Sequence, residues 1–251
     1  MDRTRLDDEQ WLQILAVLQI HAQVRIGCPD KCRAFIESVL WVLRTGAQWR
    51  QLPKERGFWN SVFKRYSRWC ARGIWSSVLE CFSTAADLEF ASIDSSVIRA
   101  HACAAGASGS SADNEALGRS KGGFSCKVHA LTDALGLPVK FMLTGGQTAD
   151  ITQAIPLVEG VSALSLLADK GYDADEFIAW LVSNGIEVVI PPKANRKEQR
   201  YCNWWLYKER HGVECMFGKL KHYRRIATRF EKKAVNYMGM LALAALMLWL
   251  R

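Results

Sequence analysis

The spacing of apolar residues changes near residue 88, and this change constrains the fold more than any other feature of the chain. Beyond it, short apolar runs of strand length alternate with runs of helical periodicity. Strands are expected at 89–98, 124–132, 137–144, 163–168 and 186–190, and helices at 150–158 and 174–183. Asp150 is placed to cap the first of these helices. This order predicts an α/β domain with a mixed sheet flanked by helices.

The first 86 residues are predicted to form amphipathic helices instead. In the third of these, aromatic residues share one side, whereas Lys64, Arg65 and Arg68 lie on the opposite flank. This pattern is typical of a helix-turn-helix recognition helix, and equally of an ordinary surface helix. We therefore expect a helix-turn-helix-like DNA-binding region at 1–86 and a catalytic domain at 87–251.

The positive charge of the chain is concentrated in one segment. Residues 191–233 contain 13 Lys and Arg against 4 Asp and Glu, a net charge of +9, whereas the remaining sequence has 20 against 21, a net charge of −1. A local excess of this kind is typical of proteins that bind polyanions, DNA or RNA first among them. The alternative is a solvated basic face without a partner.

Within this segment, one helical face combines an acid with basic residues. Drawn as a helix, the stretch from 207 onward places Tyr207, Arg210, Glu214, Lys221 and Arg225 on one narrow arc beside an apolar stripe. A surface pair between Glu214 and Arg210 would account for only about 0.2–0.5 kcal/mol of stability. That pair leaves the other members of the arc unexplained.

Two further acids stand where a sheet could bring them to Glu214. Asp94 lies inside the first strand, and Asp169 ends the fourth. Carboxylates at such positions are costly to bury unless they are paired or bind a metal ion. Clustered carboxylates are held ionised together by hard divalent cations, and two such ions can catalyse displacement at phosphorus.

Other residues compete for roles near these acids. Asp173 and Asp175 follow Asp169 closely, but they begin a helix, where capping explains them. Arg99 and His101 follow Asp94 and could reach a substrate, although a structural role explains them as well. Lys121 lies in a Gly/Ser-rich loop whose flexibility is sufficient explanation for its composition.

The motif Y-x2-R-x3-E-x6-K, formed by Tyr207, Arg210, Glu214 and Lys221, resembles the signature of bacterial DDE-type insertion-sequence transposases. The segments VLRTGAQWRQLP, SIDSSVIRAHACAAGA, KGGFSCKVHALTDALGLPV, LLADKGYD and RRIATRFEK are similar to the insertion sequence five family. The resemblance covers essentially the whole chain. It implies a ribonuclease H-like catalytic domain behind a small all-helical DNA-binding domain.

Carried over residue by residue, the resemblance assigns roles to these positions. Asp94, Asp169 and Glu214 would be the catalytic acids and would bind two Mg²⁺ ions, for which Mn²⁺ would substitute. Tyr207, Arg210 and Lys221 would hold the element end and the scissile phosphate. Further DNA contacts are expected from Arg224, Arg225, Arg229, Lys64, Arg65 and Arg68.

The implied reaction has two steps that share one site. DNA is cleaved at the terminal inverted repeats of the element to leave a 3′-hydroxyl, which then attacks target DNA. The expected partners are double-stranded DNA at both steps and a second copy of the chain, in a homodimer or higher oligomer. The resemblance also implies a bacterial cytoplasmic protein associated with the nucleoid.

Two other functions remain open at this point. A metal-dependent nuclease would use the same acids without joining ends, and a catalytically silent DNA-binding relative would have lost the acids, which are present here.

The scattered cysteines are expected to be reduced intracellular thiols. The uncharged stretch 234–250 is at the lower limit for a membrane span, so we expect a buried terminal helix and no membrane partner.

Overall fold

The computed structural model of the chain describes residues 4–251, which form two compact units. The sheet unit comprises residues 83–99 and 116–219, and the helical unit comprises residues 4–82, 100–115 and 220–251. These units divide the chain in more places than the expected boundary at residue 86, because residues 220–251 pack with the N-terminal helices. The assignment of DNA binding to 1–86 and catalysis to 87–251 stays a prediction.

A mixed sheet forms the centre of the sheet unit. Its strands are β1 (Phe90–Ala100), β2 (Gly118–Ser120), β3 (Gly123–Thr132), β4 (Pro138–Gly145), β5 (Ser165–Leu167) and β6 (Glu187–Val189). They lie in the order β2-β3-β1-β5-β6, with β4 also paired to β3. β3 is antiparallel to β1 and β4, whereas β5 is parallel to both β1 and β6. The predicted α/β fold with a mixed sheet is confirmed.

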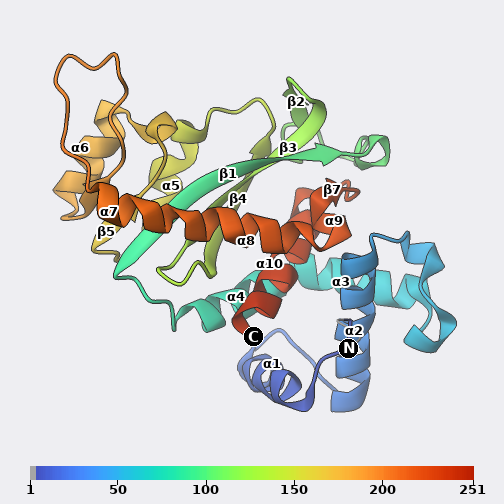
Figure 1. Cartoon of the computed structure of the whole chain (residues 1–251). Helices are drawn as coiled ribbons and strands as arrows, with labels where there is room; N and C mark the ends of the chain where they lie inside the picture. Colours follow the sequence, from blue (N-terminus) through green and yellow to red (C-terminus); the bar gives the residue numbers. More distant parts are fainter. Residues whose placement is uncertain (1–3) are drawn as a thin grey trace. The chain divides into compact units, whose positions relative to one another are not determined.

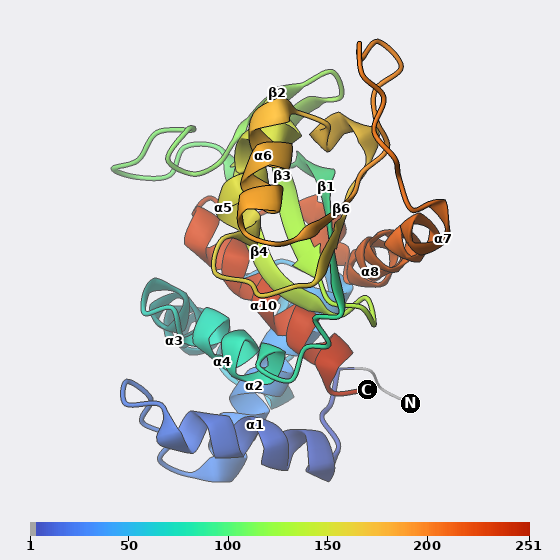
Figure 2. The same ribbon diagram turned by 90° about the vertical axis from the view of Figure 1, so that its left-hand side faces the viewer.

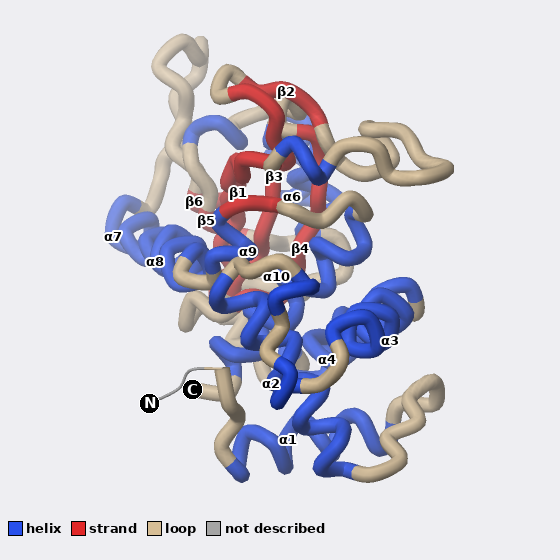
Figure 3. The backbone as a smooth tube through the Cα atoms, turned by 90° about the vertical axis from the view of Figure 1, so that its right-hand side faces the viewer, coloured by secondary structure: helices blue, strands red, loops and turns tan. Residues whose placement is uncertain are grey.

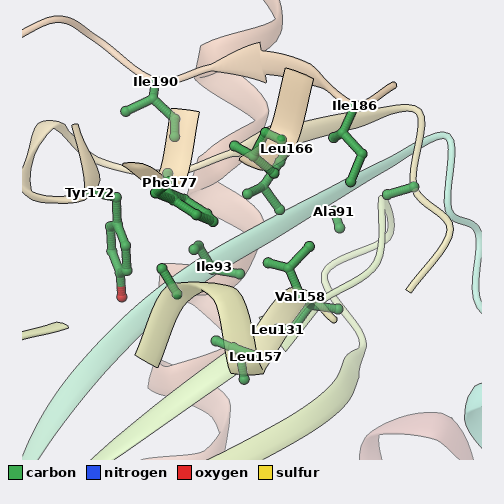
Figure 4. Close-up of a cluster of buried hydrophobic side chains, with 14 residues drawn as sticks. Ala91, Ile93, Leu131, Leu157, Val158, Leu166, Tyr172, Phe177, Ile186 and Ile190 are labelled. Carbon is green, nitrogen blue, oxygen red and sulfur yellow. The ribbon is translucent and has the colours of Figure 1, made fainter. Parts of the chain in front are cut away.

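Helices cover both faces of this sheet. α5 (Ala154–Val158) and α6 (Asp175–Ser183) lie on one side of the strands, and α7 (Trp204–Tyr207) and α8 (His211–Lys221) lie on the other (Figure 2). On the α5 and α6 side, Ile93 of β1, Leu166 of β5 and Phe177 of α6 belong to one buried apolar cluster (Figure 4). A smaller cluster packs Leu167 and Val189 against α7.

Two glycines let α8 approach the turn between β3 and β4. Gly136 adopts a positive φ of 72° in this turn, and Asp133 Oδ1 accepts hydrogen bonds from the backbone N–H groups of Leu135 (3.0 Å) and Leu137 (2.7 Å). A Cβ on Gly136 would lie 3.1–3.3 Å from backbone atoms of Gly212. The close approach holds the first turn of α8 beside the turn between β3 and β4, and α8 runs along the sheet (Figure 1). Glu214 follows Gly212 by two residues.

The helical unit contains only helices and turns over residues 4–82 (Figure 3). Its helices are α1 (Asp8–Ile20), α2 (Pro29–Thr45), α3 (Trp59–Ala71), α4 (Ile74–Ser83), α9 (Arg224–Ala227) and α10 (Ala234–Trp249), and Thr228–Arg229 form the short β7. Phe35 and Trp75 each pack against Trp69, with ring centroids 5.1 Å apart in both pairs. The Tyr66 hydroxyl donates to the carbonyl of Asn236, which ties α3 to α10.

The predicted C-terminal helix is α10, and nearly all of its side chains from Asn236 to Leu248 are buried. Within residues 4–251, no helix has both the length and the apolar composition needed to cross a membrane. The helix is therefore accounted for by packing within the helical unit.

Gly239 in α10 is expected to resist substitution by Ala. A Cβ there would lie 2.5 Å from Cys70 Sγ and 3.1 Å from atoms of Trp75 and Tyr66. Ala is normally favoured over Gly inside a helix by about 1 kcal/mol, but overpacking here should make Gly239→Ala destabilising by about 1–3 kcal/mol in denaturant unfolding. Gly218→Ala in α8, where nothing lies within 4 Å of the added Cβ, should be neutral or stabilising. Equal gains from both substitutions would contradict the packing of α10.

Candidate active site

Asp94 and Asp169 are brought together by the parallel pairing of β1 with β5. Ser92 pairs with Leu167 in this ladder. Two positions after each member of this pair come Asp94, still in β1, and Asp169, just beyond the end of β5. The charge of Asp169 is close enough to raise the pKa of Asp94. The sequence-predicted juxtaposition of the two acids is therefore present.

The Asp94 carboxylate is partly buried and held by two donors. Its Oδ1 accepts from the backbone N–H of Ser95 at 2.8 Å, and its Oδ2 lies 3.2 Å from Arg210 Nη1. Burial raises the pKa of Asp94 above its usual value, while the Ser95 hydrogen bond and the Arg210 charge oppose that rise. The Arg210 charge therefore only partly offsets the cost of burying the Asp94 carboxylate, and a further cation bound there would offset more of it.

Asp169 is fixed by the turn that follows β5. It precedes the 3-10 turn η5 (Lys170–Tyr172), and its Oδ1 accepts from the backbone N–H of Gly171 at 2.8 Å. A Cβ at Gly171 would lie 2.8 Å from the same oxygen. The absence of a side chain at Gly171 therefore leaves room for the carboxylate of Asp169.

Glu214 reaches the same place from α8. The Arg210 guanidinium binds Glu214 Oε1 through Nη2 and Asp94 Oδ2 through Nη1, so a single cation links the two carboxylates. Arg210 belongs to the 3-10 turn η6 (Lys208–Arg210), which connects α7 to α8. The predicted pair between Arg210 and Glu214 exists, but it is part of a three-residue bridge that includes Asp94.

The donor groups fit a hard divalent cation in chemistry. Asp94, Asp169 and Glu214 supply carboxylate oxygens, which Mg²⁺ and Mn²⁺ prefer. Among residues 4–251, no three Asp, Glu, His or Cys side chains are grouped closely enough to hold one metal ion. Arg210 provides the positive charge between Asp94 and Glu214 in this arrangement, so metal binding by all three acids requires its guanidinium to move aside.

Of the other signature residues, Tyr207 lies in α7 and Lys221 ends α8. The Tyr207 ring packs against Leu167 and Val189 and lies 6.0 Å from the Arg210 guanidinium carbon. It therefore helps to position Arg210. Lys221 is exposed, and the helix stops there, so Arg225 belongs to a separate helix and does not continue the predicted arc.

The remaining predicted DNA contacts differ in exposure. Lys64, Arg68 and Arg224 are exposed, as binding to DNA requires. Arg65 is half-buried: its guanidinium lies 4.3 Å from the ring centroid of Phe35 and donates to Cys32 Sγ at 3.2 Å.

Arg225 and Arg229 are buried in the helical unit, which contradicts the prediction that they contact DNA. Arg225 pairs with Glu231 (Nε to Oε1, 2.5 Å) and donates to the carbonyl of Ala47 at 2.6 Å. Arg229 is fully buried and donates to the carbonyls of Glu115 (2.7 Å) and Glu231 (3.0 Å). Both guanidinium groups are occupied in holding distant segments together.

Asp173 also has a role other than the predicted helix cap. It is buried, it bonds with Arg196 and Arg200, and its Oδ2 accepts from the backbone N–H of Lys193 at 2.8 Å. Burial acts to raise the pKa of Asp173, but these hydrogen bonds outweigh it and lower the pKa. Asp173 thus anchors the basic loop after β6 and is not available as the second catalytic acid.

Sequence reasoning missed a polar cluster beside the acids. Lys127 Nζ lies 2.8 Å from Asp150 Oδ1, so Asp150 forms an ion pair where a helix cap was expected. The buried Tyr172 hydroxyl lies near Asp150, Asp94 and Asp169; burial and these three charges together raise the pKa of Tyr172 far above its usual value. The signal in the sequence was Lys127 and His129, two polar residues on one face of an otherwise apolar strand.

His129 gives the sheet unit a defined sensitivity to acid. Its side chain is fully buried, with Nε2 2.9 Å from Thr144 Oγ1 and Nδ1 3.9 Å from Asp150 Oδ1. Burial lowers the pKa of His129 to about 4, against the opposing charge of Asp150. The unfolded chain therefore takes up a proton near pH 6.5 that the folded chain excludes until about pH 4.

We expect His129 to remove about 3 kcal/mol of stability in total as the pH falls from 6.5 to 4. His129→Gln, which keeps a donor toward Thr144, should flatten this part of the profile in denaturant unfolding at several pH values. His222→Gln, at an exposed histidine, should leave the profile unchanged. An unaltered acid slope in His129→Gln would show that His129 is not buried in the neutral form.

Comparison with known proteins gives matches along most of the chain. Residues 86–250 match a family model described as "Transposase DDE domain", and residues 6–79 match one described as "Putative transposase of IS4/5 family". The "Putative transposase for insertion sequence element IS6501" of Brucella ovis is 44% identical over 128 residues, which are 50% of this chain and 98% of that protein.

Two further matches cover less of the other protein. The "Putative transposase for insertion sequence element IS402" of Burkholderia cepacia is 35% identical over 120 residues, 43% of this chain and 54% of that protein. The solved piggyBac transposase synaptic complex with hairpin DNA has a TM-score of 0.45 at 12% identity, and the match covers 79% of this chain and 51% of that chain.

Proposed function

This chain belongs to the IS4/5 family of transposases with a DDE domain, and from that premise we propose the chemistry that it performs. It cleaves DNA at the inverted-repeat ends of its insertion sequence and joins the resulting 3′-hydroxyl ends to target DNA. The observation that carries this proposal is the convergence of Asp94 and Glu214 on one guanidinium group, with Asp169 beside Asp94.

We infer that the DDE domain of this chain uses divalent metal ions, because carboxylate oxygens are the ligands that such ions prefer. In this chain Asp94, Asp169 and Glu214 would hold two Mg²⁺ ions, or Mn²⁺ in their place. Bound there, the ions would supply the positive charge that activates the attacking oxygen and stabilises the leaving oxygen. The protein contributes the three carboxylates from β1, α8 and the turn after β5, and the Arg210 guanidinium would have to move aside before all three could hold the ions.

Arg210 has two successive partners in this proposal. Before the metal ions bind, its guanidinium offsets the repulsion between the carboxylates of Asp94 and Glu214. With ions held by the acids, the Arg210 guanidinium would be free to bind the scissile phosphate, for which its planar pair of donors is well suited. Tyr207 packs behind it and limits where it can move.

Other parts of the DNA are bound by exposed cations of the helical unit. We assign this role to Lys221 and Arg224, and to Lys64 and Arg68 on α3. Cleavage at two ends and their joining to one target call for more than one active site, so the proposal includes a homodimer or higher oligomer on double-stranded DNA. The location that follows from this substrate is the bacterial nucleoid in the cytoplasm.

The proposal is tested by incubating the purified protein with DNA carrying the element's own end and a supercoiled target plasmid. Joined products that require Mg²⁺, and that disappear with Glu214→Gln, are the expected result. Cleavage without joined products would replace the proposal by a metal-dependent nuclease. DNA binding without either reaction would leave a catalytically silent DNA-binding protein.

A further inference from the structure

The sheet unit contains a basic pocket that lies outside the acidic site. Its volume is about 700 Å³, and its lining includes Val97 and Arg99 of β1, Arg119 of β2, Lys121 and Gly122 of the following turn, and Gln147 after β4. Three cations thus face one concave surface, and no acid contributes to it. We name it the β1-end pocket.

The three cations are not neutralised by the protein. In the part of the chain that the structure describes, Arg99, Arg119 and Lys121 form no ion pair with any carboxylate. Uncompensated like charges within one concavity repel one another and raise the local concentration of anions. The three positive charges therefore repel one another, and a bound anion would reduce this repulsion.

The walls of the pocket are fixed by packing and hydrogen bonds. The side chain of Gln147 lies directly on the backbone of Gly118, where a Cβ would come within 1.8 Å of its Oε1 atom. Ser125 Oγ donates to Ser120 Oγ at 3.0 Å, and the backbone N–H of Gly146 donates to the carbonyl of Ser125 at 3.3 Å. The pocket is thus preformed, which reduces the entropy lost when a ligand binds.

We propose that the β1-end pocket binds phosphodiester groups of the DNA backbone away from the reacting phosphate. Arg and Lys are the side chains that contact DNA phosphates most often. Val97, 45% exposed between these cations, offers an apolar surface for a deoxyribose, and Gly122 leaves the backbone accessible. This inference rests on the proposed function for the identity of the polyanion as the element or target DNA.

The pocket lies along β1 from the acidic site. Arg99 follows Asp94 by five residues, which is about 16 Å along a strand that rises about 3.3 Å per residue, and an odd separation places the two side chains on opposite faces of the strand. The phosphates that the pocket holds are therefore other than the scissile one.

The test measures DNA binding without metal, in a Glu214→Gln background, so that neither cleavage nor joining affects it. The triple variant Arg99→Gln, Arg119→Gln, Lys121→Gln should bind a fixed duplex at least about tenfold more weakly, and its slope of log affinity against log salt should fall in magnitude by about two to three. Lys140→Gln, at a lysine of β4 outside the pocket whose Nζ donates to the carbonyls of Pro156 and Glu159, should retain both values. An unchanged slope in the triple variant would overturn the proposal.

A second measurement locates the contact and does not depend on how well the triple variant folds. End duplexes carrying one neutral methylphosphonate, placed at each position in turn, should bind the Glu214→Gln protein more weakly at one or a few phosphates away from the cleavage position. Arg119→Lys, which keeps the charge, should preserve this pattern, whereas Arg119→Gln should weaken it. A pattern identical in Arg119→Gln would exclude the pocket as the contact.

The two proposals can fail separately. Joined products from the wild-type protein, together with an unchanged salt slope in the triple variant, would reject the β1-end pocket and leave the transposase reaction standing. A reduced salt slope in the triple variant without joined products from the wild type would support the β1-end pocket and reject the transposase reaction.

Discussion

Asp94→Asn, Asp169→Asn and Glu214→Gln are each expected to lower strand cleavage and joining by at least about a thousandfold. Each replacement removes a negative charge but keeps the size of the side chain, and the chemistry depends on the charges that hold the metal ions. DNA binding without metal should stay within about threefold of the wild type, because backbone affinity depends on cations elsewhere. Cleavage is measured on end DNA with Mg²⁺, and binding by titration in its absence.

The chain offers a matched acid for each comparison. Glu209→Gln alters an exposed acid in η6, one residue before Arg210, and Asp175→Asn alters the acid that pairs with Arg196 at the start of α6. Both should keep wild-type cleavage. Mg²⁺-dependent cleavage retained by any one of the three active-site variants would remove that residue from the metal-binding set.

A direct measurement of metal binding separates loss of metal from loss of chemistry. In Mn²⁺ titrations without DNA, Asp94→Asn should bind the ion more weakly than the wild-type protein. Arg210 opposes metal binding electrostatically as long as it lies between Asp94 and Glu214, so Arg210→Gln should bind Mn²⁺ more tightly while cleaving DNA more slowly. Tighter binding with slower cleavage is the combination that distinguishes a displaced guanidinium from a purely structural one.

The sheet and two of the acids could be predicted from the sequence because local patterns determine them. Strand runs and their connections indicate a mixed sheet, and the parallel pairing of β1 with β5 then brings Asp94 level with Asp169. The helical phase from Arg210 to Glu214 predicted their ion pair correctly. What it could not give was the third partner, Asp94, which lies 116 residues from Arg210 along the chain.

Residues whose partners are distant in sequence were misplaced for the same reason. The position of Asp150 at the start of a helical run suits a helix cap. Its side chain instead pairs with Lys127, which lies in β3. Arg225 and Arg229 were expected to contact DNA, but both are buried, and burying a charge is costly unless it is paired. Ala47 and Glu115, which contribute the carbonyl groups that offset this cost, are separated from the two arginines by more than a hundred residues.

The burial of Arg225 leads to a large effect on stability that DNA binding would not predict. Arg225→Met should lower the free energy of unfolding by about 3–5 kcal/mol, because it leaves Glu231, whose side chain is only 3% exposed, without its partner. The carbonyl of Ala47 also loses its donor. The measurement is denaturant unfolding followed by tryptophan fluorescence, since Arg225 lies 5.7 Å from the ring centroid of Trp49.

The neighbouring Arg224 provides the control within the same helix. Arg224→Gln, at an exposed position, should change stability by no more than about 0.5 kcal/mol and reduce the salt slope of DNA binding by about one. The double variant Arg225→Met, Glu231→Leu should recover much of the stability lost by Arg225→Met alone, because no buried charge then remains unpaired. Arg225→Met could instead keep full stability and reduce the salt slope as Arg224→Gln does. That result would show that Arg225 is an exposed DNA contact and is not buried in the helical unit.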